Sequence, residues 1–453
     1  MTNYRAEFIV PIRNIISLIR IFTVIFTCKF ICTPKSRGIY LAKSLEKLGP
    51  SFIKFGQALS VRADVVGDDI SASLERLQDR MPPFSSKKAI ATIEKELGQK
   101  VQDIFAEFGN QSVAAASIAQ VHKATTKDGK VVAVKILRPG IEKKFKHDIA
   151  LLYFVARIVS WIPSCKRLRP IEIVDVFAET VRKELDLRME AACASQLRSN
   201  CKNDEGIYIP QIFWEYTARR VLVLEWIDGI QINDKKSLIK AGHDLQNISK
   251  NLTITFLNQA FRDGFFHADI HPGNLFVDNA GRIVPVDFGI MGIIDRNTRI
   301  YVAEILRGFL TGDYMHVAQI HFDAGYVDAD KSVHDFALAC RAIGEPIMGL
   351  PANKVSIAKL LTLLFKITED FNMRTQPQLL LLQKTMVLIE GVGQNLHPEA
   401  NMWQMAEGWI ASWAKDNLSP SAQIKNSLKD LLAIAKNLPQ RLKDIDKILN
   451  KAG

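Results

Sequence analysis

Two short polar segments constrain the fold more than any other feature of the chain. HADIHPGN covers residues 267–274, and DFG, residues 287–289, begins thirteen residues after that segment ends. Between them, LFVDNAGRIVPV reads as two short strands around a turn at Asn279–Ala280–Gly281, which predicts a hairpin. Such a hairpin brings Asn274 and Asp287, which stand at its two ends, to the same place. A lone DFG is common by chance, but one placed across a single short hairpin from this polar segment is not.

The spacing matches a phosphate-transfer site. In protein kinases, HRDxxxxN supplies an Asp that positions the attacking hydroxyl and an Asn that holds magnesium. Asp269 and Asn274 keep that five-residue offset, and Asp287 stands where the DFG carboxylate chelates the magnesium that bridges the phosphates. VAVK ends at Lys135, where a kinase lysine holds the α- and β-phosphates. Pro272–Gly273 would form a turn in any case, but together the signals predict ATP and Mg²⁺ as cofactors, with Asn274 and Asp287 as metal ligands.

The segment expected to cover the phosphates departs from the kinase pattern GxGxxGxV. Alanine replaces glycine at all three places, and Val121 takes the fourth, fourteen residues before Lys135. Glycine allows close approach of backbone N–H groups to phosphate, so alanine predicts a stiffer loop and poor transfer to a bulky protein substrate. The residues expected to contact nucleotide here are Ala114, Ala115, Ala116, Ser117, Ala119 and Val121.

The pattern along the chain predicts an α+β, bilobal protein-kinase-like fold with an N-terminal helical extension. We expect helices over 38–107, a strand, turn and strand over 112–137 with Asp128–Gly129 as the turn, helices over 141–200, strands near 207–213 and 220–227, and mainly helices beyond 245. The expected domains are an interfacial helix at 1–35, a helical extension at 36–107, an N-lobe at 108–228, a C-lobe at 229–400 and a helical tail at 401–453.

Residues 8–32 are apolar but carry Arg13, Arg20 and Lys29. On a helix, the arginines fall on a narrow polar face opposite a wide apolar one, which favours a helix lying in a membrane interface. A helix docked on the protein body is the alternative. The formal charge of +11, from 59 Lys and Arg against 48 Asp and Glu, suggests an anionic partner. The basic residues are dispersed without aromatic interleaving, which argues against nucleic acid.

Several motifs together resemble the UbiB family of atypical kinase-like proteins. The alanine-rich loop AAASIAQVH spans 114–122, KxGQ spans Lys54–Gln57, and ExD spans Glu184–Asp186. VLVLEWIDG resembles the hinge between the lobes, with Glu225 and Ile227 as nucleotide contacts.

The resemblance implies that Lys54 and Gln57 face the active site, with Glu184 and Asp186 as candidate partners. A lysine beside two carboxylates would form a charge-assisted contact that seals the cleft. Glu190 is the preferred partner of Lys135, with Glu184 as the alternative, and the sequence leaves this choice open.

The resemblance also implies an ATPase or kinase-like activity that supports ubiquinone biosynthesis. The implied partners are membrane lipids and quinone-pathway intermediates or enzymes, at the cytoplasmic face of the bacterial inner membrane, and a homodimer stays open. Bacterial relatives often carry two hydrophobic C-terminal helices, whereas residues 400–453 contain no such run, so attachment is expected to be peripheral. A nucleotide-binding pseudokinase scaffold and a small-molecule phosphotransferase are the competing hypotheses.

Overall fold

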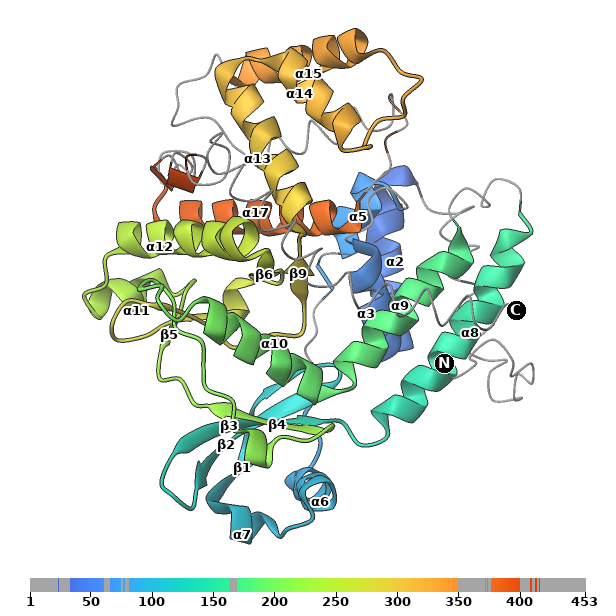
Figure 1. The fold of residues 1–453 in the computed structure, drawn as a ribbon. Helices are drawn as coiled ribbons and strands as arrows, with labels where there is room; N and C mark the ends of the chain where they lie inside the picture. The colour runs from blue at the N-terminus through green and yellow to red at the C-terminus, as the bar shows by residue number, and fades with distance from the viewer. Residues whose placement is uncertain are drawn as a thin grey trace, which may run out of the picture. The chain divides into compact units, whose positions relative to one another are not determined.

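The structure is a computed structural model (Figure 1). It describes residues 23, 33–60, 66–74, 76–77, 81–162, 169–348, 371, 373, 376–399, 408–409, 412–413 and 415. The expected interfacial helix at 1–35 therefore lies outside the described residues except for its last three positions and residue 23, as does most of the expected tail at 401–453. Among the described residues, no helix is both long and apolar enough to cross a bilayer.

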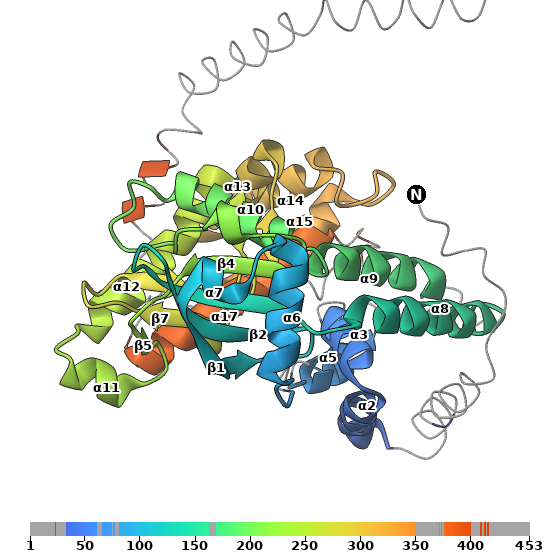
Figure 2. The same cartoon turned by 90° about the horizontal axis from the view of Figure 1, so that it is seen from below.

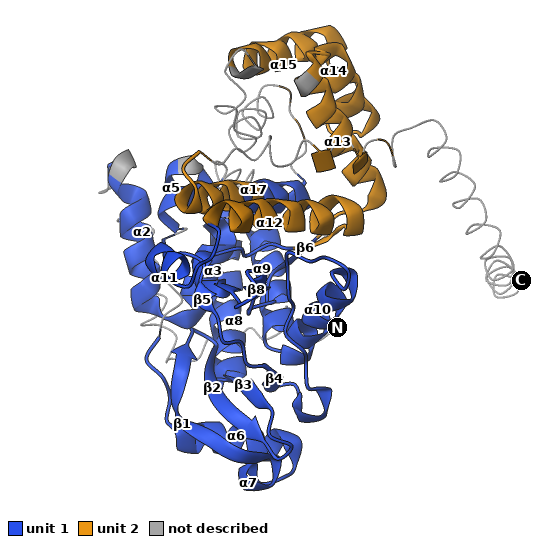
Figure 3. Cartoon of the chain, turned by 90° about the vertical axis from the view of Figure 1, so that its left-hand side faces the viewer, with its two compact units in different colours: residues 1–244, 267–292, 375–385 blue, residues 245–266, 293–374, 386–453 orange. Residues whose placement is uncertain are grey.

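The chain divides into two compact units, coloured separately in Figure 3. The first comprises residues 1–244, 267–292 and 375–385, and the second comprises 245–266, 293–374 and 386–453. Three elements begin in one unit and end in the other: β6 (Phe265–His267), β9 (Met291–Ile293) and α17 (Pro377–Leu396).

Of the strands in the described residues, the first unit contains all apart from β6 and β9. Its helices are α2 (Pro34–Leu48), α3 (Pro50–Ser60), α5 (Asp68–Leu74), α6 (Ser86–Leu97), α7 (Val101–Ile104), α8 (Ile141–Ser160), α9 (Pro170–Glu184), α10 (Leu187–Asn200) and α11 (Lys235–Lys240). Its strands are β1 (Phe105–Ala115), β2 (Ala119–Thr126), β3 (Val131–Leu137), β4 (Val221–Glu225), β5 (Ile230–Gln231), β7 (Leu275–Val277) and β8 (Ile283–Pro285). Short 3-10 helices cover Trp214–Tyr216 and Pro272–Asn274.

Strands β1 to β4 form an antiparallel sheet in sequence order, and α6 lies against it (Figures 1 and 2). Alternate residues of β3, Val132, Val134 and Ile136, are fully buried and pack with Ala89 and Ile93 of α6. This period-two pattern leaves Lys135 on the opposite face of the sheet from the α6 core. The apolar run that identifies the strand thus also orients its lysine.

Two predicted hairpins are confirmed. The Thr126 N–H donates to the Lys130 carbonyl at 2.9 Å across the turn at Asp128–Gly129, where Gly129 has φ +81°. β7 and β8 pair antiparallel around a turn at Gly281, which has φ +78°. Glycine accommodates this left-handed conformation without a Cβ clash.

Two predicted strands are wrong in detail. The expected single strand after residue 112 is interrupted, because β1 ends at Ala115 and β2 begins at Ala119 after a tight turn. The expected strand at 207–213 forms only isolated bridges, from Ile207 to Ile283 and from Ile212 to Leu224. Pro210 lies between them and cannot donate a ladder hydrogen bond.

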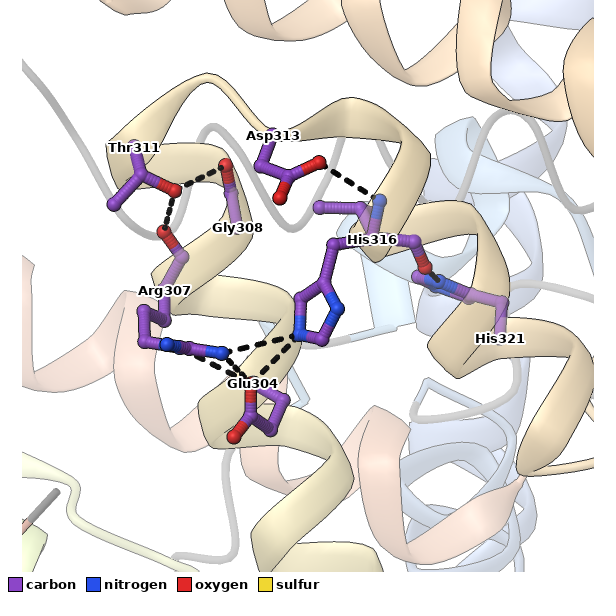
Figure 4. A network of polar contacts seen from close by, with 8 residues as sticks. Glu304, Arg307, Gly308, Thr311, Asp313, His316 and His321 are labelled. Carbon is purple, nitrogen blue, oxygen red and sulfur yellow. Dashed lines mark hydrogen bonds and ion pairs between the residues drawn. The ribbon is translucent and has the colours of Figure 1, made fainter. Parts of the chain in front are cut away.

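The second unit is helical, as predicted beyond residue 245. It contains α12 (Leu245–Leu257), a π-helical segment (Asn258–Asp263), α13 (Arg296–Thr311), α14 (Tyr314–Asp323) and α15 (Val333–Met348). Figure 4 shows the polar contacts that join α13 to α14. The Glu304 carboxylate lies 2.7 Å from His316 Nε2 and 2.5 Å from Arg307 Nη2, and Asp313 caps α14 by accepting from the His316 N–H at 3.0 Å.

Candidate active site

Lys135 is held between two carboxylates that come from distant parts of the first unit. Its Nζ lies 2.7 Å from Glu190 Oε1 on α10 and 3.4 Å from Asp287 Oδ2. The Lys135 and Glu190 side chains are 12% and 8% exposed, so the pair is largely shielded from water. Of the two carboxylates left open by the sequence, Glu190 is the one that contacts Lys135.

The electrostatics follow from this convergence. Burial opposes the charge on Lys135, but the carboxylates of Asp287 and Glu190 outweigh it and raise the pKa of the amine. Burial also opposes ionisation of Asp287, yet the Lys135 ammonium holds the pKa of this carboxyl below its ordinary value. Burial, reinforced by the Asp287 charge, raises the pKa of Glu190 to about 7 against the pull of Lys135. At neutral pH, Lys135 and Asp287 are charged and Glu190 is poised to titrate.

The segment around Asp269 is joined to DFG through His267. His267 Nε2 donates to the carbonyl of Asp287, and His267 Nδ1 accepts from the Asp269 N–H at 3.2 Å. One donating and one accepting nitrogen describe a neutral ring with its proton on Nε2. Burial lowers the pKa of His267, which agrees with that neutral form. Sequence reasoning did not single out His267, although it opens the HxD pattern.

Asn274 is placed beside Asp269. Asn274 Nδ2 donates to Asp269 Oδ2 at 3.2 Å, and the carbonyl of Asn274 accepts from the Val286 N–H at 3.0 Å. The second contact fixes the base of the hairpin that carries Asp287. The hairpin therefore brings the segments of Asn274 and Asp287, the two predicted metal ligands, next to each other.

The donor set fits Mg²⁺, which prefers a small number of carboxylate and carbonyl oxygens and retains water. The Asp287 side chain is 42% exposed although its oxygens also meet Lys135 and the Gly289 N–H, at 3.4 and 3.0 Å. An ionised carboxylate that is still accessible to solvent can bind a hydrated cation. The Asn274 side chain offers an amide oxygen from the same hairpin.

The alanine-rich residues form the turn between β1 and β2. Ala114 pairs with Val121 and Ala115 with Gln120, while the Ala116 N–H donates to the Ala119 carbonyl at 2.8 Å. Val121 lies directly opposite Lys135 in the β2–β3 register. This register brings the predicted phosphate-covering loop to the strand that carries the lysine. Ser117, in the turn itself, is fully buried.

The helical extension reaches the same cluster through Lys54. Lys54 Nζ lies 3.4 Å from Glu184 Oε2 at the end of α9, and the two side chains are 15% and 10% exposed. Phe55 packs edge-on against Phe177 of α9, with ring centroids 5.1 Å apart, which fixes α3 against this helix. The Lys54 charge also contributes to the lowered pKa of Asp287.

The other two residues of these motifs have different partners. Gln57 donates its amide to the Leu77 carbonyl at 3.2 Å. Asp186 is not the partner of Lys54: it caps α10 through the Arg188 N–H and holds the Arg188 guanidinium at 2.6 and 2.8 Å. A short acidic side chain at a helix N-cap satisfies a backbone donor, which explains this placement.

The hinge residues follow β4. Glu225 accepts hydrogen bonds from the Tyr208 hydroxyl, at 2.7 and 3.0 Å, and from the Gln211 N–H at 3.0 Å. The backbone N–H of Trp226 donates to the Val131 carbonyl at 3.1 Å, and Ile227 is half-buried. Because the Glu225 carboxylate is engaged in this way, contacts of this segment with a nucleotide would come mainly from its backbone.

Comparison with known proteins agrees with this geometry. Residues 76–321 match the model of the ABC1 atypical kinase-like domain, and residues 340–401 match the UbiB helical domain. A protein of Marinobacter nauticus named "Probable protein kinase UbiB" is 42% identical, covering 97% of this chain and 82% of the relative. A protein of the same name from Pseudomonas putida is 41% identical, covering 90% and 78%.

A solved structure is also similar. Rv3197 of Mycobacterium tuberculosis, determined as a complex with erythromycin, is 26% identical with a TM-score of 0.54. The match covers 78% of this chain and 90% of the mycobacterial chain. The kinase-like fold expected from the motif spacing is therefore confirmed.

Proposed function

Because this chain belongs to the UbiB family of ABC1 atypical kinase-like proteins, we propose that it binds Mg²⁺-ATP and turns it over to support ubiquinone biosynthesis at a membrane. The observation that carries the proposal is the meeting of Lys135 with Glu190 and Asp287. A strand, a helix and a hairpin here bring one buried lysine and two carboxylates together. Burying charged groups is costly, so such a cluster favours a functional site.

In this proposal each residue has a distinct task. Lys135, oriented by Glu190, binds the phosphates of the nucleotide. Asp287 and Asn274 would hold Mg²⁺, which supplies charge neutralisation for the phosphates when bound. Asp269, kept in place by the Asn274 amide at 3.2 Å, accepts the proton of the attacking hydroxyl or water.

The acceptor is water or a small lipid-like molecule. Lys54, from the helical extension, is close enough to Asp287 to influence its ionisation and is itself tied to Glu184. A side chain in this position takes up room that a protein substrate would need. The membrane part of the proposal rests on the amphipathic pattern of residues 8–32 and on the family name, and places the chain peripherally at the cytoplasmic face of the inner membrane.

A nucleotide-binding scaffold without turnover is the second candidate. The observation that favours it is the alanine turn at 114–119, which lacks the glycines that let a loop close on phosphates. In that case, Lys135, Asn274 and Asp287 would bind the nucleotide and its metal ion without catalysing turnover.

Turnover measured beside affinity separates the two candidates. We expect purified protein with Mg²⁺-ATP and anionic liposomes to release phosphate, and Lys135→Ala, Asp269→Ala and Asp287→Asn to abolish this release. In bacteria that depend on the gene, the same variants should lose ubiquinone. Tight ATP binding without phosphate release by the unsubstituted protein would favour the scaffold, and normal ubiquinone levels in all three variants would refute the catalytic proposal.

A further inference from the structure

The turn between β1 and β2 is held through its carbonyl oxygens. The Ala115 carbonyl accepts from the Met81 N–H at 3.4 Å, and the Ala116 carbonyl accepts from Arg138 Nε at 2.9 Å. The Ile118 carbonyl accepts from the backbone N–H of Arg138 at 2.8 Å. Arg138 therefore contacts the turn twice, once with its side chain and once with its backbone.

The Arg138 guanidinium also contacts residues 82–84, which lie just before α6. Arg138 Nη2 donates to the Pro82 carbonyl at 2.9 Å, and the guanidinium lies over the Phe84 ring, 5.6 Å from its centroid. The planar fork of arginine can hold two acceptors in fixed directions, which lysine cannot do. Arg138 thus joins the alanine turn to residues 82–84.

This second segment is itself anchored. The Gln120 side chain, 1% exposed, accepts from the Phe84 N–H at 2.9 Å and donates to the Phe84 carbonyl at 3.2 Å. Gln120 Nε2 also lies 2.7 Å from His122 Nε2, and His122 Nδ1 lies 2.7 Å from the Gly109 carbonyl. The segment that Arg138 contacts is therefore itself held in place by the buried side chain of Gln120.

The direction of one carbonyl fixes the direction of the next N–H group. In a trans peptide, the C=O and N–H bonds point to opposite sides, and the structure contains no cis peptide among the residues that it describes. Because Arg138 holds the Ala116 carbonyl, the Ser117 N–H points away from the Arg138 guanidinium. The Ser117 hydroxyl oxygen is buried and has no hydrogen-bond partner within the described part of the chain. A buried hydroxyl without a partner is costly unless a ligand satisfies it.

We propose that Arg138 is a positioning residue, which orients the Ala116–Ser117 peptide so that the Ser117 N–H and hydroxyl together bind a phosphate of the nucleotide. This inference rests on the proposed function and adds a phosphate-recognition element to it. In kinases with a glycine-rich loop, backbone N–H groups of that loop bind the phosphates. Here Ser117 would do so, and Arg138, which lies outside the turn, would orient its peptide group. It also connects nucleotide binding to residues 82–84, just before α6.

Calorimetric titration of the full chain with ADP in the presence of Mg²⁺, and separately with adenosine, tests the proposal. Arg138→Gln and Ser117→Ala should each raise the Kd for ADP by about tenfold, the effect of losing roughly one hydrogen bond to a charged group. The Kd for adenosine should not change, because adenosine has no phosphate. Arg138→Lys, which retains charge without the fork, should lie between. Since both residues act through one peptide, the double variant should lose little more than either single one.

Arg182→Gln is the matched control, because Arg182 is exposed on α9 and pairs only locally with Glu179 among the contacts described. It should leave both affinities unchanged. An equal loss of ADP and adenosine affinity in Arg138→Gln would indicate a general structural role and overturn the inference. Unchanged ADP affinity in Arg138→Gln or Ser117→Ala would overturn the inference alone, whereas no ADP binding by the unsubstituted protein would overturn the proposed function with it.

Discussion

The Lys135 amine and the Glu190 carboxylate lie 2.7 Å apart although their positions differ by 55 in the chain. β3 supplies the lysine and α10 the glutamate, and a backbone contact extends the pair toward DFG, because the Phe288 N–H lies 3.4 Å from the same Glu190 oxygen. Phe288 is 1% exposed, so the position of the DFG segment is fixed by burial. Glu190 therefore connects the lysine with the segment that carries Asp287.

Glu190→Gln should reduce ATP turnover strongly. The neutral amide keeps the shape of the side chain but loses the charge-assisted contact that orients Lys135, so we expect kcat/KM to fall by about a hundredfold. Steady-state phosphate release measures this. Glu172→Gln, an exposed glutamate paired with Arg169, is the control and should behave as the unsubstituted protein. Equal activity of Glu190→Gln and the control would show that Glu190 does not orient Lys135 for ATP turnover.

The stability of the protein should respond to pH through Glu190. Its pKa rises from an ordinary 4.5 to about 7 on folding, so the folded state holds the proton more tightly. This contribution is present below pH 4.5 and is lost as the pH rises through 7, to an extent of about 1–3 kcal/mol.

Urea denaturation between pH 5 and 8 measures this effect. The difference in unfolding free energy between the unsubstituted protein and Glu190→Gln should shrink from the acid to the alkaline end, since glutamine does not titrate. A difference that grows with pH would show that the sign is wrong.

Breaking the Lys54–Glu184 pair should cost more stability than breaking an exposed pair does. Because both side chains are largely buried, Lys54→Met leaves a carboxylate with a lost partner, and we expect a cost of about 3 kcal/mol. The double variant Lys54→Met/Glu184→Leu should recover much of it. Lys130→Met is the control, since its partner Asp128 is 54% exposed and solvent screens such a pair, so its loss should change stability little. Equal losses in the two single variants would contradict the prediction.

Removal of residues 1–32 should release the protein from liposomes that contain anionic lipid. The deletion stops before Thr33, whose carbonyl accepts from the N–H groups of Ser36 and Arg37 at the start of α2. Full-length Arg13→Gln/Arg20→Gln should weaken binding and make it less sensitive to salt, because it removes charge and retains the apolar face. Cosedimentation of the deletion variant at the unsubstituted level would refute an N-terminal attachment site.

The sequence predicts the parts of the site that depend on short-range spacing. Asn274 and Asp287 stand at the two ends of the β7–β8 hairpin, so the turn at Gly281 brings their segments together, and Asp269 is joined to Asn274 by a hydrogen bond. The choice between Glu184 and Glu190 could not be made, because α9 ends at Glu184 and α10 restarts after the Asp186 cap. The change of helix between them decides which carboxylate reaches Lys135, and no periodicity crosses that break.

Other details depended on tertiary contacts. The turn at Ala116–Ile118 contains no glycine, proline or asparagine that would predict it, and it is stabilised by Arg138 from beyond β3. The segment at 207–213 has the apolar alternation of a strand, and Ile207, Ile209 and Ile212 are indeed buried. Burial of these side chains was predictable from the pattern, whereas the loss of continuous pairing depends on the local effect of Pro210.

Calorimetric titration with ATP and Mg²⁺ tests the central claim most directly, because the account requires Lys135 and Asp287 to meet the same nucleotide. The unsubstituted protein should bind ATP in a magnesium-dependent manner. Lys135→Ala should weaken ATP binding at every magnesium concentration, and Asp287→Asn should remove the magnesium dependence. Magnesium-dependent ATP binding of unchanged strength in both variants would contradict the account.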